Sequence, residues 1–350
     1  MVTIKMIAKE CGFSIATVSK ALNGAPDISA ETKETIRKVA SQMGYTPNSA
    51  ARMLKTSRSY NFGVLFEDQA NKGLTHSFFS HILNSFKHRA EELGYDISFI
   101  SDHMGGQEIS YVDHARYRNC DGVVIASVDY TEHAVVDLAN SGIPVVNFDV
   151  DVDCQGIYKV TGDNYDMGYQ SAKYITEKVG PAANIVVMDV PSSGSVCELR
   201  KQGFYDYLKE VSYDESNIFE VQLESFARDK GLAGMADVLE AHPQIDAVFS
   251  MDDETSMGAI QAITEAGRKD IKAITGGGGC QEYFRMINDP AYADLGLASA
   301  LYSPAMSQDA IRTAIDVLEG GHPESVVVIP TTIVSADNVA DYLDPENTVY

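Results

Sequence analysis

Apolar residues recur at helical spacing through the first 58 residues of the chain. The pattern predicts a short helix over Ile4–Cys11, a second over Ile15–Leu22 and a longer third over Ser29–Met43. Between the first two helices, Gly12 supplies a tight turn and Ser14 the N-cap of the helix that follows. This order is typical of a helix-turn-helix, whose second helix lies in the major groove of DNA.

Any small three-helix bundle has such apolar positions, and here they predict a core of Ile7, Ala8, Val18, Ala21, Leu22, Ile36 and Val39. The polar positions carry more information, because short donors suited to phosphate or base contacts gather on the exposed side. These are Thr3, Ser14, Thr17, Ser19, Lys20 and Asn23. Their clustering favours a DNA-binding head over a bundle without a nucleic-acid partner.

From Asn61 onward, apolar strand-like runs alternate with helical patterns. Strands are predicted over Phe62–Phe66, Ile97–Ser101, Gly122–Ser127, Val145–Asp149, Ile185–Val190, Ile218–Leu223, Ala247–Met251 and Ala273–Gly276. Helices are predicted over Phe79–Gly94, Tyr165–Val179, Glu198–Val211, Gly231–His242 and Thr255–Gly267. The alternation favours an α/β body of parallel sheets with helices on both faces, and its length suits two lobes.

Charge separates the two parts of the chain. Up to Tyr60, nine basic and four acidic residues give a net charge of +5, whereas the whole chain carries −23 and the remainder therefore −28. A polyanion would attract the first part and repel the second. The asymmetry indicates a nucleic-acid-binding head on an acidic body.

The segments TIKMIAKECGFSIATVSKALNG and GYTPNSAARMLKT resemble the LacI/GalR family of bacterial transcription regulators. The resemblance extends over essentially the whole chain. It implies a small all-α helix-turn-helix head and a two-lobed body like that of periplasmic binding proteins. It also implies a homodimer that binds double-stranded operator DNA under the control of a small-molecule effector.

The resemblance assigns base reading to Ile15, Ala16 and Lys20. It assigns phosphate contacts to Thr3, Ser14, Thr17, Ser19, Asn23 and Tyr45. Two residues depart from the family. Lys20 stands where an Arg is usual and lacks its planar fork. Met6 replaces a commoner Asp, which leaves the capping of the first helix in question.

The helix after Pro47 corresponds to the family's hinge, which orders on the operator and inserts a Leu between base pairs of the minor groove. Leu54 occupies that position, and Arg52 lies beside it as a further DNA contact. Residues 48–56 are too few for an independently stable helix, so they should order only with DNA and a partner hinge. The alternative is that Leu54 is an ordinary apolar residue of the linker.

These observations predict a helix-turn-helix domain over residues 1–47 and a hinge and linker over 48–60. The N-terminal lobe is expected over 61–161 plus 294–320, and the C-terminal lobe over 162–293 plus 321–340. The crossings are placed near Thr161–Asp163, Pro290–Asp294 and Gly320–Glu324. Because open α/β sheets bind ligands beyond the carboxyl ends of their strands, residues at those ends are candidates for effector binding between the lobes.

The residues that match effector-binding positions of the family are Phe78, Phe79, Asp149, Arg200, Phe226 and Asp252. Aromatic faces with charged hydrogen-bonding groups suit a polar ring, most simply a sugar. Phe78 and Phe79 are consecutive and cannot both face one core, and Arg200 could instead belong to a solvated helix face. Asp163 and Asp253 are expected to shape turns and cap helices.

One loop departs from the family. Relatives carry Gly-x-Asp after the strand that ends at Thr275, whereas this chain has four glycines, Gly276 to Gly279. Our hypothesis is that Asp252 supplies the acid and that Gly277 and Gly278 donate backbone hydrogen bonds to the effector. A phosphate-binding loop is a weaker alternative, because the Lys-Ser/Thr of a P-loop is missing.

Five scattered cysteines without CxxC spacing favour reduced thiols in the cytoplasm, close to the nucleoid when the protein is bound to DNA, and predict no metal site. No signal peptide and no membrane partner are expected. No HxH, HExxH or GxSxG motif occurs, so neither enzymatic activity nor a cofactor is predicted.

The remaining alternatives concern the ligand and the role of the body. A purine-type or sugar-phosphate corepressor could replace the sugar, and a distant alternative is a sugar-binding protein without a regulatory role. The C-terminal segment has no sustained heptads and predicts no tetramer-forming coil, so a dimer is expected.

Overall fold

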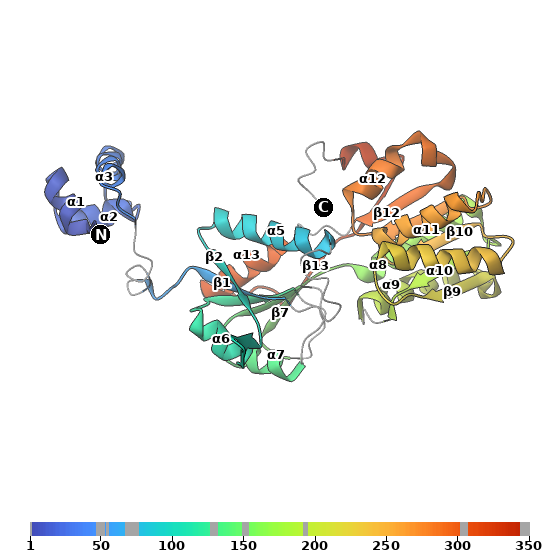
Figure 1. Ribbon diagram of the computed structural model, residues 1–350, viewed down its shortest axis with the longest axis horizontal. Coiled ribbons are helices and arrows are strands. Elements are labelled where there is room, and N and C mark those ends of the chain that lie inside the picture. The colour runs from blue at the N-terminus through green and yellow to red at the C-terminus, as the bar shows by residue number, and fades with distance from the viewer. Residues whose placement is uncertain are drawn as a thin grey trace. The chain divides into compact units, whose positions relative to one another are not determined.

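The computed structural model describes residues 2–46, 53, 56–66, 77–126, 132–148, 154–191, 195–301 and 307–343. It divides into two compact units, a head over Met1–Ser59 and a body over Tyr60–Tyr350 (Figure 1). The predicted fold class is confirmed: the head is helical, and the body contains two sheets built almost entirely of parallel strands.

The head contains α1 (Ile4–Cys11), α2 (Ile15–Leu22) and α3 (Ala30–Gln42), in agreement with the three predicted helices. Their apolar faces meet in one core made of Ile7, Ala8, Val18, Ala21, Ile36 and Ala40. Leu22, Val39 and Tyr45 pack against this core from partly buried positions. The predicted hinge helix lies mostly outside the described residues, as do Arg52 and Leu54.

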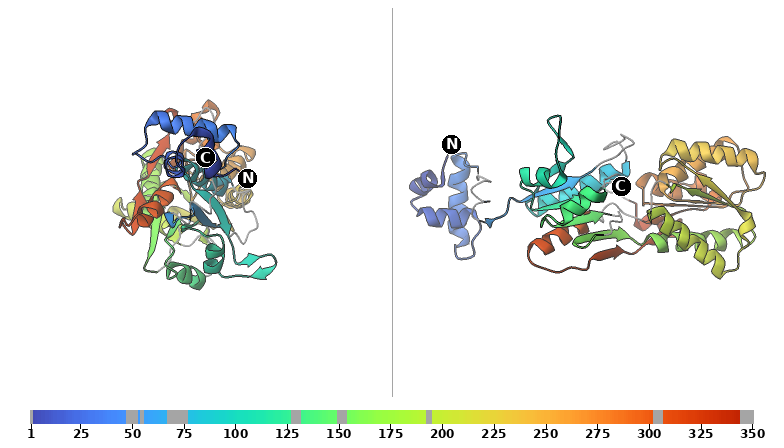
Figure 2. Two further views of the ribbon diagram at one scale, coloured as in Figure 1. Left: turned by 90° about the vertical axis from the view of Figure 1, so that its left-hand side faces the viewer. Right: turned by 90° about the horizontal axis from the view of Figure 1, so that it is seen from below.

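The first sheet of the body has the strand order β13-β7-β6-β5-β1-β2, and all its strands are parallel. The strands are β1 (Asn61–Leu65), β2 (Asp96–Ile100), β5 (Gly122–Ile125), β6 (Val145–Phe148), β7 (Ile157–Gly162) and β13 (Val326–Ile329). Alternate residues serve two cores: Val64 faces α5 (Ser77–Glu92) and α13 (Ser307–Leu318), whereas Leu65 belongs with α6 (Tyr111–Tyr117) and α7 (Glu132–Ala139). A hairpin of β3 (His103–Met104) and β4 (Gln107–Glu108) projects beyond this sheet (Figure 2).

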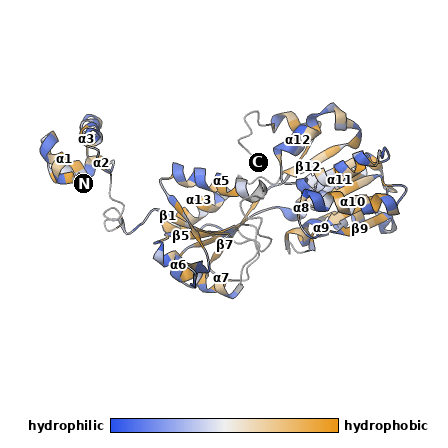
Figure 3. Ribbon diagram, in the orientation of Figure 1, coloured by the Kyte–Doolittle hydropathy of each residue, from blue (hydrophilic) through white to orange (hydrophobic). Residues whose placement is uncertain are grey.

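The second sheet has the order β14-β12-β11-β10-β8-β9, and only β14 is antiparallel to its neighbour. The strands are β8 (Ile185–Asp189), β9 (Ile218–Gln222), β10 (Ala247–Ser250), β11 (Ala273–Gly277), β12 (Leu297–Leu301) and β14 (Thr332–Ser335). Its helices are α8 (Asn164–Val179), α9 (Ser195–Glu210), α10 (Arg228–Ala241), α11 (Asp253–Glu265) and α12 (Gln281–Asn288), with short 3-10 turns at Glu215–Asn217, Pro290–Leu295 and Val339–Asp341. Figure 3 shows apolar strands within both sheets and polar outer faces on the helices.

Two of the three expected crossings between the lobes are wrong. β7 ends the first sheet's segment at Gly162, near the expected position. The chain then stays with the second sheet through β12, so residues 294–301 do not belong to the N-terminal lobe. It returns to the second sheet only between β13 and β14, later than Gly320–Glu324. The mixed patterns of β12 and β14 gave little indication of a strand, and the apolar run of β13 does not say which sheet it joins, because that is decided by strand pairing.

Helix α8 crosses α9 at two glycines that permit backbone contact. A Cβ atom at Gly168 would lie 1.7 Å from the Arg200 carbonyl oxygen, and one at Gly203 would lie 2.0 Å from the Tyr165 carbonyl oxygen. Neither position could hold a larger residue without separating the helices. The close crossing brings the side chain of Arg200, in the second turn of α9, to that of Asn164 at the start of α8.

Candidate functional site

The helix-turn-helix is built from capped helices. Ser14, in an extended conformation, accepts a hydrogen bond from the Thr17 N–H at 3.1 Å and caps α2 as predicted. Thr3 caps α1 in the same way, accepting from the Met6 N–H at 3.3 Å. The family's Asp at position 6 is therefore not needed to start this helix. Gly12 adopts φ +73°, the left-handed conformation that the turn between α1 and α2 requires.

The expected base readers lie on one exposed side of α2. Ile15 is 53 % exposed, and Ala16 and Lys20 are also exposed. Lys20 forms an ion pair with Asp27, a residue of the loop that follows α2. Sequence reasoning did not link these two residues, because they are seven positions apart and belong to different elements.

The expected phosphate contacts differ in accessibility. Thr17 and Ser19 are partly buried, while Asn23 is exposed and its side-chain amide donates to the Ser19 carbonyl at 2.6 Å. Asn23 thereby helps to close the carboxyl end of α2. Tyr45 is partly buried against the head core, and its N–H donates to the Ala40 carbonyl.

The head also exposes apolar side chains that sequence reasoning did not assign to DNA. Met6 of α1 is 48 % exposed, and Phe13, two residues before the exposed Ile15, is 36 % exposed. Apolar contacts of this kind suit thymine methyl groups. Phe13, an aromatic residue directly before the N-cap Ser14, was the feature of the sequence that could have indicated this exposed apolar surface.

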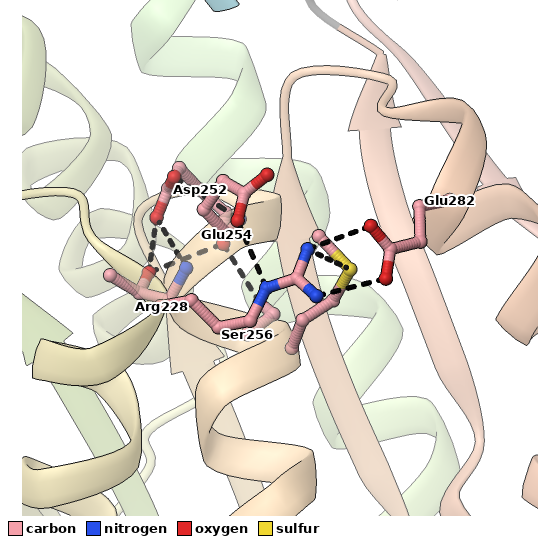
Figure 4. Close-up of polar contacts among 7 residues, drawn as sticks. Arg228, Asp252, Glu254, Ser256 and Glu282 are labelled. Atoms are coloured by element: carbon pink, nitrogen blue, oxygen red, sulfur yellow. Dashed lines mark hydrogen bonds and ion pairs between the residues drawn. The ribbon is translucent and has the colours of Figure 1, made fainter. Parts of the chain in front are cut away.

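In the body, Asp252 follows β10 and caps α11. Its carboxylate accepts from the N–H groups of Glu254 and Thr255 at 3.2 and 3.1 Å and from the Thr255 hydroxyl (Figure 4). Burial raises the pKa of Asp252 to about 6, although the Thr255 hydrogen bonds act in the opposite direction. The acid that sequence reasoning assigned to effector binding therefore also holds the first turn of the helix.

Asp253 is fully buried and fastens the glycine loop. Its carboxylate accepts from the N–H groups of Gly279 and Cys280 at 2.9 and 2.8 Å and from the Ser299 hydroxyl at 2.8 and 3.0 Å. Burial raises the pKa of Asp253 to about 7. The expectation that Asp253 shapes local structure agrees with these contacts, and Asp163 likewise caps α8 by accepting from the Asp166 N–H.

These contacts change the hypothesis for the glycine loop. Gly277 is buried at the end of β11, where a Cβ atom would lie 1.5 Å from Met167 Cε. The Gly278 N–H donates to the Ala300 carbonyl at 3.0 Å, and the next two N–H groups donate to Asp253. In this conformation the amides from Gly278 to Cys280 are engaged internally, so they do not form an anion nest. Close packing explains the glycines better than phosphate binding does.

Arg200 is only 4 % exposed, which excludes the alternative that it belongs to a solvated helix face. Its Nε donates to Asn164 Oδ1 at 2.8 Å and its Nη1 donates to the Met251 carbonyl at 2.5 Å. The guanidinium therefore connects α9, the start of α8 and the end of β10. Its positive charge also lowers the pKa of Asp252, though less than burial raises it.

An arginine that sequence reasoning missed joins the starts of three helices. Arg228, at the first position of α10, donates to Glu254 of α11 at 3.1 Å and to both oxygens of Glu282 of α12 at 2.9 and 2.8 Å (Figure 4). These ion pairs raise its pKa further above its already high value. Phe226 lies two residues earlier and is partly buried against the core of the second sheet. The LESFARDKG segment places both residues beyond the carboxyl end of β9.

The other expected effector residues belong to the first lobe, and the structure describes only some of them. Phe78 and Phe79 are in the first turn of α5, as expected for the aromatic pair. Asp149 falls outside the described residues.

Within the described ranges, no group of three or more His, Cys, Asp or Glu residues could hold a metal ion. A search of the same ranges found no helix with the length and apolarity that crossing a membrane requires.

The chain is similar to known proteins along nearly all its length. Residues 3–48 match the model of bacterial regulatory proteins of the lacI family, and residues 70–322 match a periplasmic binding protein domain. The HTH-type transcriptional regulator CelR of Thermobifida fusca is 25 % identical over 271 residues, which are 76 % of this chain and 78 % of that protein. The repressor PurR of Pectobacterium carotovorum subsp. carotovorum (strain PC1) is 24 % identical over 356 residues, covering 98 % and 99 %.

A crystal structure of the lac repressor dimer bound to operator and the anti-inducer ONPF has the same fold. Its TM-score is 0.73 at 20 % identity, with 95 % of this chain and 98 % of that chain covered. Together, the capped helix-turn-helix, the two-lobed body and the matches to both family models show that this chain belongs to the lacI family of bacterial regulatory proteins.

Proposed function

We propose that this DNA-binding regulator represses transcription as a homodimer on a near-palindromic operator, and that a sugar bound to the body releases it. The observation that carries the proposal is the pairing of a capped, basic head with an acidic body of the periplasmic-binding-protein class. One head reads too few base pairs to select a site, which favours a dimer. A DNA partner and reduced thiols favour a cytoplasmic protein.

The sugar assignment draws on named relatives. CelR has been solved as a cellobiose complex, with a TM-score of 0.60 to this chain at 21 % identity. The ribose import binding protein RbsB of Escherichia coli (strain K12) is 26 % identical over 251 residues, covering 71 % of this chain and 82 % of that protein. In this chain the proposed contacts at the carboxyl end of the second sheet are Arg200, Phe226 and Asp252.

Each proposed residue has a chemistry that suits a polar ring. Phe226 supplies an apolar face, and Asp252 has carboxylate oxygens that can accept from hydroxyl groups. Arg200 is held rigidly by Asn164 and Met251, so that binding would cost little side-chain ordering. The aromatic pair Phe78 and Phe79 and the acid Asp149 are proposed to complete the site from the first lobe.

The proposed mechanism is linkage between the effector and the operator. A ligand that prefers one arrangement of the two lobes shifts the equilibrium between operator-competent and incompetent dimers. A coupling of about 1–3 kcal/mol would change operator affinity roughly 5- to 150-fold. A purine or sugar phosphate that promotes operator binding is the second candidate.

A thermal-shift screen of the full chain with sugars, sugar phosphates and nucleobases would identify the effector class, since a true ligand raises the melting temperature with concentration. Asp252→Ala should then weaken binding of the hit. Asp289→Ala is the matched control, because Asp289 caps the turn after α12, before β12 begins at the other end of the sheet. Equal ligand affinity in the wild type and Asp252→Ala would remove Asp252 from the site.

A further inference from the structure

The ion pair between Lys20 and Asp27 lies on the DNA-reading head. Lys20 is in the last turn of α2, and its ammonium group donates to the Asp27 carboxylate. Both side chains are 52 % exposed. An exposed pair of this kind contributes little to folding stability, so its effect should be sought in what the two charges do to a ligand.

The loop after α2 is folded so that Asp27 returns to the helix that it follows. Gly24 adopts φ +75°, and the Ala25 N–H donates to the Lys20 carbonyl at 3.0 Å. This is the hydrogen bond that closes a Schellman motif at the end of a helix. Ile28 then packs against the head core. The chain is therefore fixed before Asp27 by the Schellman hydrogen bond and after it by the packing of Ile28, so the backbone sets the position of Asp27 next to Lys20.

We propose that Asp27 is a specificity-determining residue. The carboxylate holds the Lys20 ammonium over the exposed face of α2, where the ammonium can donate to a base edge, and it keeps the ammonium from binding phosphates. The inference rests on the proposed DNA-binding function of the head. Lysine is a point charge with three donors on a flexible stem, whereas arginine has a planar fork. Once one donor is taken by Asp27, the other two have restricted directions.

The ion pair has different consequences for contacts with base edges and for contacts with phosphates. A guanine offers two neighbouring acceptors, O6 and N7, which the two remaining donors can reach while the pair persists. A phosphate competes with Asp27 for the ammonium and is repelled by the carboxylate. Without Asp27, Lys20 is free to bind phosphates, which strengthens sequence-independent binding and weakens selection of the base.

The test uses the full chain and a pool of duplexes with a randomised core, from which wild-type protein, Asp27→Asn, Glu34→Gln and Lys20→Met select binding sites. Glu34→Gln is the matched control, because it removes one negative charge from an exposed position of α3 and has no contact with Lys20. Affinity for the selected duplex and for mixed-sequence genomic DNA is measured against salt concentration for each variant.

Asp27→Asn should lower the ratio of specific to non-specific affinity by about fivefold or more, flatten the base preference at one position per half-site, and steepen the salt dependence of non-specific binding by about 0.9. Glu34→Gln should strengthen binding to both DNAs without changing the selected sequence. In Lys20→Met, adding Asp27→Asn should no longer alter base preference. The inference is overturned if Asp27→Asn and Glu34→Gln behave alike. Failure of the wild type to enrich any sequence would overturn the proposed function as well.

Discussion

Replacing Asp253 with alanine should destabilise the second lobe of the body strongly, whereas asparagine should be tolerated. Alanine leaves the buried N–H groups of Gly279 and Cys280 and the Ser299 hydroxyl without their acceptor. Each lost partner costs about 1–3 kcal/mol, and with partial relaxation of the loop we expect a total of about 3 kcal/mol. Asparagine keeps one oxygen for both amides and can donate to Ser299 from its nitrogen.

The same site predicts how stability depends on pH. Burial raises the pKa of Asp253 to about 7 in the fold, well above the usual range of an aspartate. Between about pH 4 and pH 7 the folded protein therefore holds a proton that the unfolded chain has released, so the stability contributed by this group is greatest below the unfolded pKa, falls as pH rises through this range and levels off above the folded pKa. From pH 6 to pH 8 the loss is about 1.4 kcal/mol for this one group. Asp252 titrates lower, at about 6, and affects mainly the range below this window.

Urea unfolding of the full chain at pH 6 and pH 8 measures both effects. The chain has no tryptophan, so the transition is followed by far-ultraviolet circular dichroism. Asp253→Asn should lose about 1.4 kcal/mol less than the wild type between the two pH values. The reasoning is refuted if the two proteins show the same pH dependence, or if Asp253→Ala is as stable as Asp253→Asn.

Three further outcomes are expected. Gly203→Ala should destabilise the body by about 1–3 kcal/mol and lower its melting temperature, because backbone atoms block the added Cβ. Gly234→Ala, whose Cβ would meet side-chain atoms and no backbone, should cost less. Ser14→Ala should cost about 1 kcal/mol of head stability and weaken DNA binding, as circular dichroism and a filter-binding titration would show. In the folded protein, Cys120 and Cys280 should resist alkylation at pH 7.5, as measured by mass spectrometry, since burial raises the pKa of each thiol to about 12.

Strong local signals explain what could be predicted from the sequence. The head was predictable because its helices have both apolar periodicity and N-caps. Ser14, for example, has a residue type that favours the N-cap position and so predicts where α2 begins. The central strands were predictable because they are continuous apolar runs buried on both faces, as in β8 and β10. The edge strand β14 has a mixed pattern, and its sheet is decided by pairing that no local signal encodes.

The contacts of the site depend on tertiary structure and were only partly predictable. Position in the family pattern makes Arg200 and Asp252 candidates for effector binding, but it did not predict that Arg200 is buried and hydrogen-bonded to Asn164 of α8. The internal use of the glycine-loop amides depends on Asp253, which lies more than twenty residues earlier. The three-helix role of Arg228 could not be inferred, because its partners belong to distant helices.

The order of strands in the two sheets has a consequence for synthesis of the protein. Strand β13 completes the first sheet beside β7, and β14 completes the second beside β12, so neither sheet has all its strands until the chain has been synthesised past residue 325. Until then, β7 and β12, which are inner strands of the finished sheets, are exposed edges and sites for mispairing with other chains. A ribosome that stops before residue 326 would therefore release two incomplete halves instead of one finished and one missing.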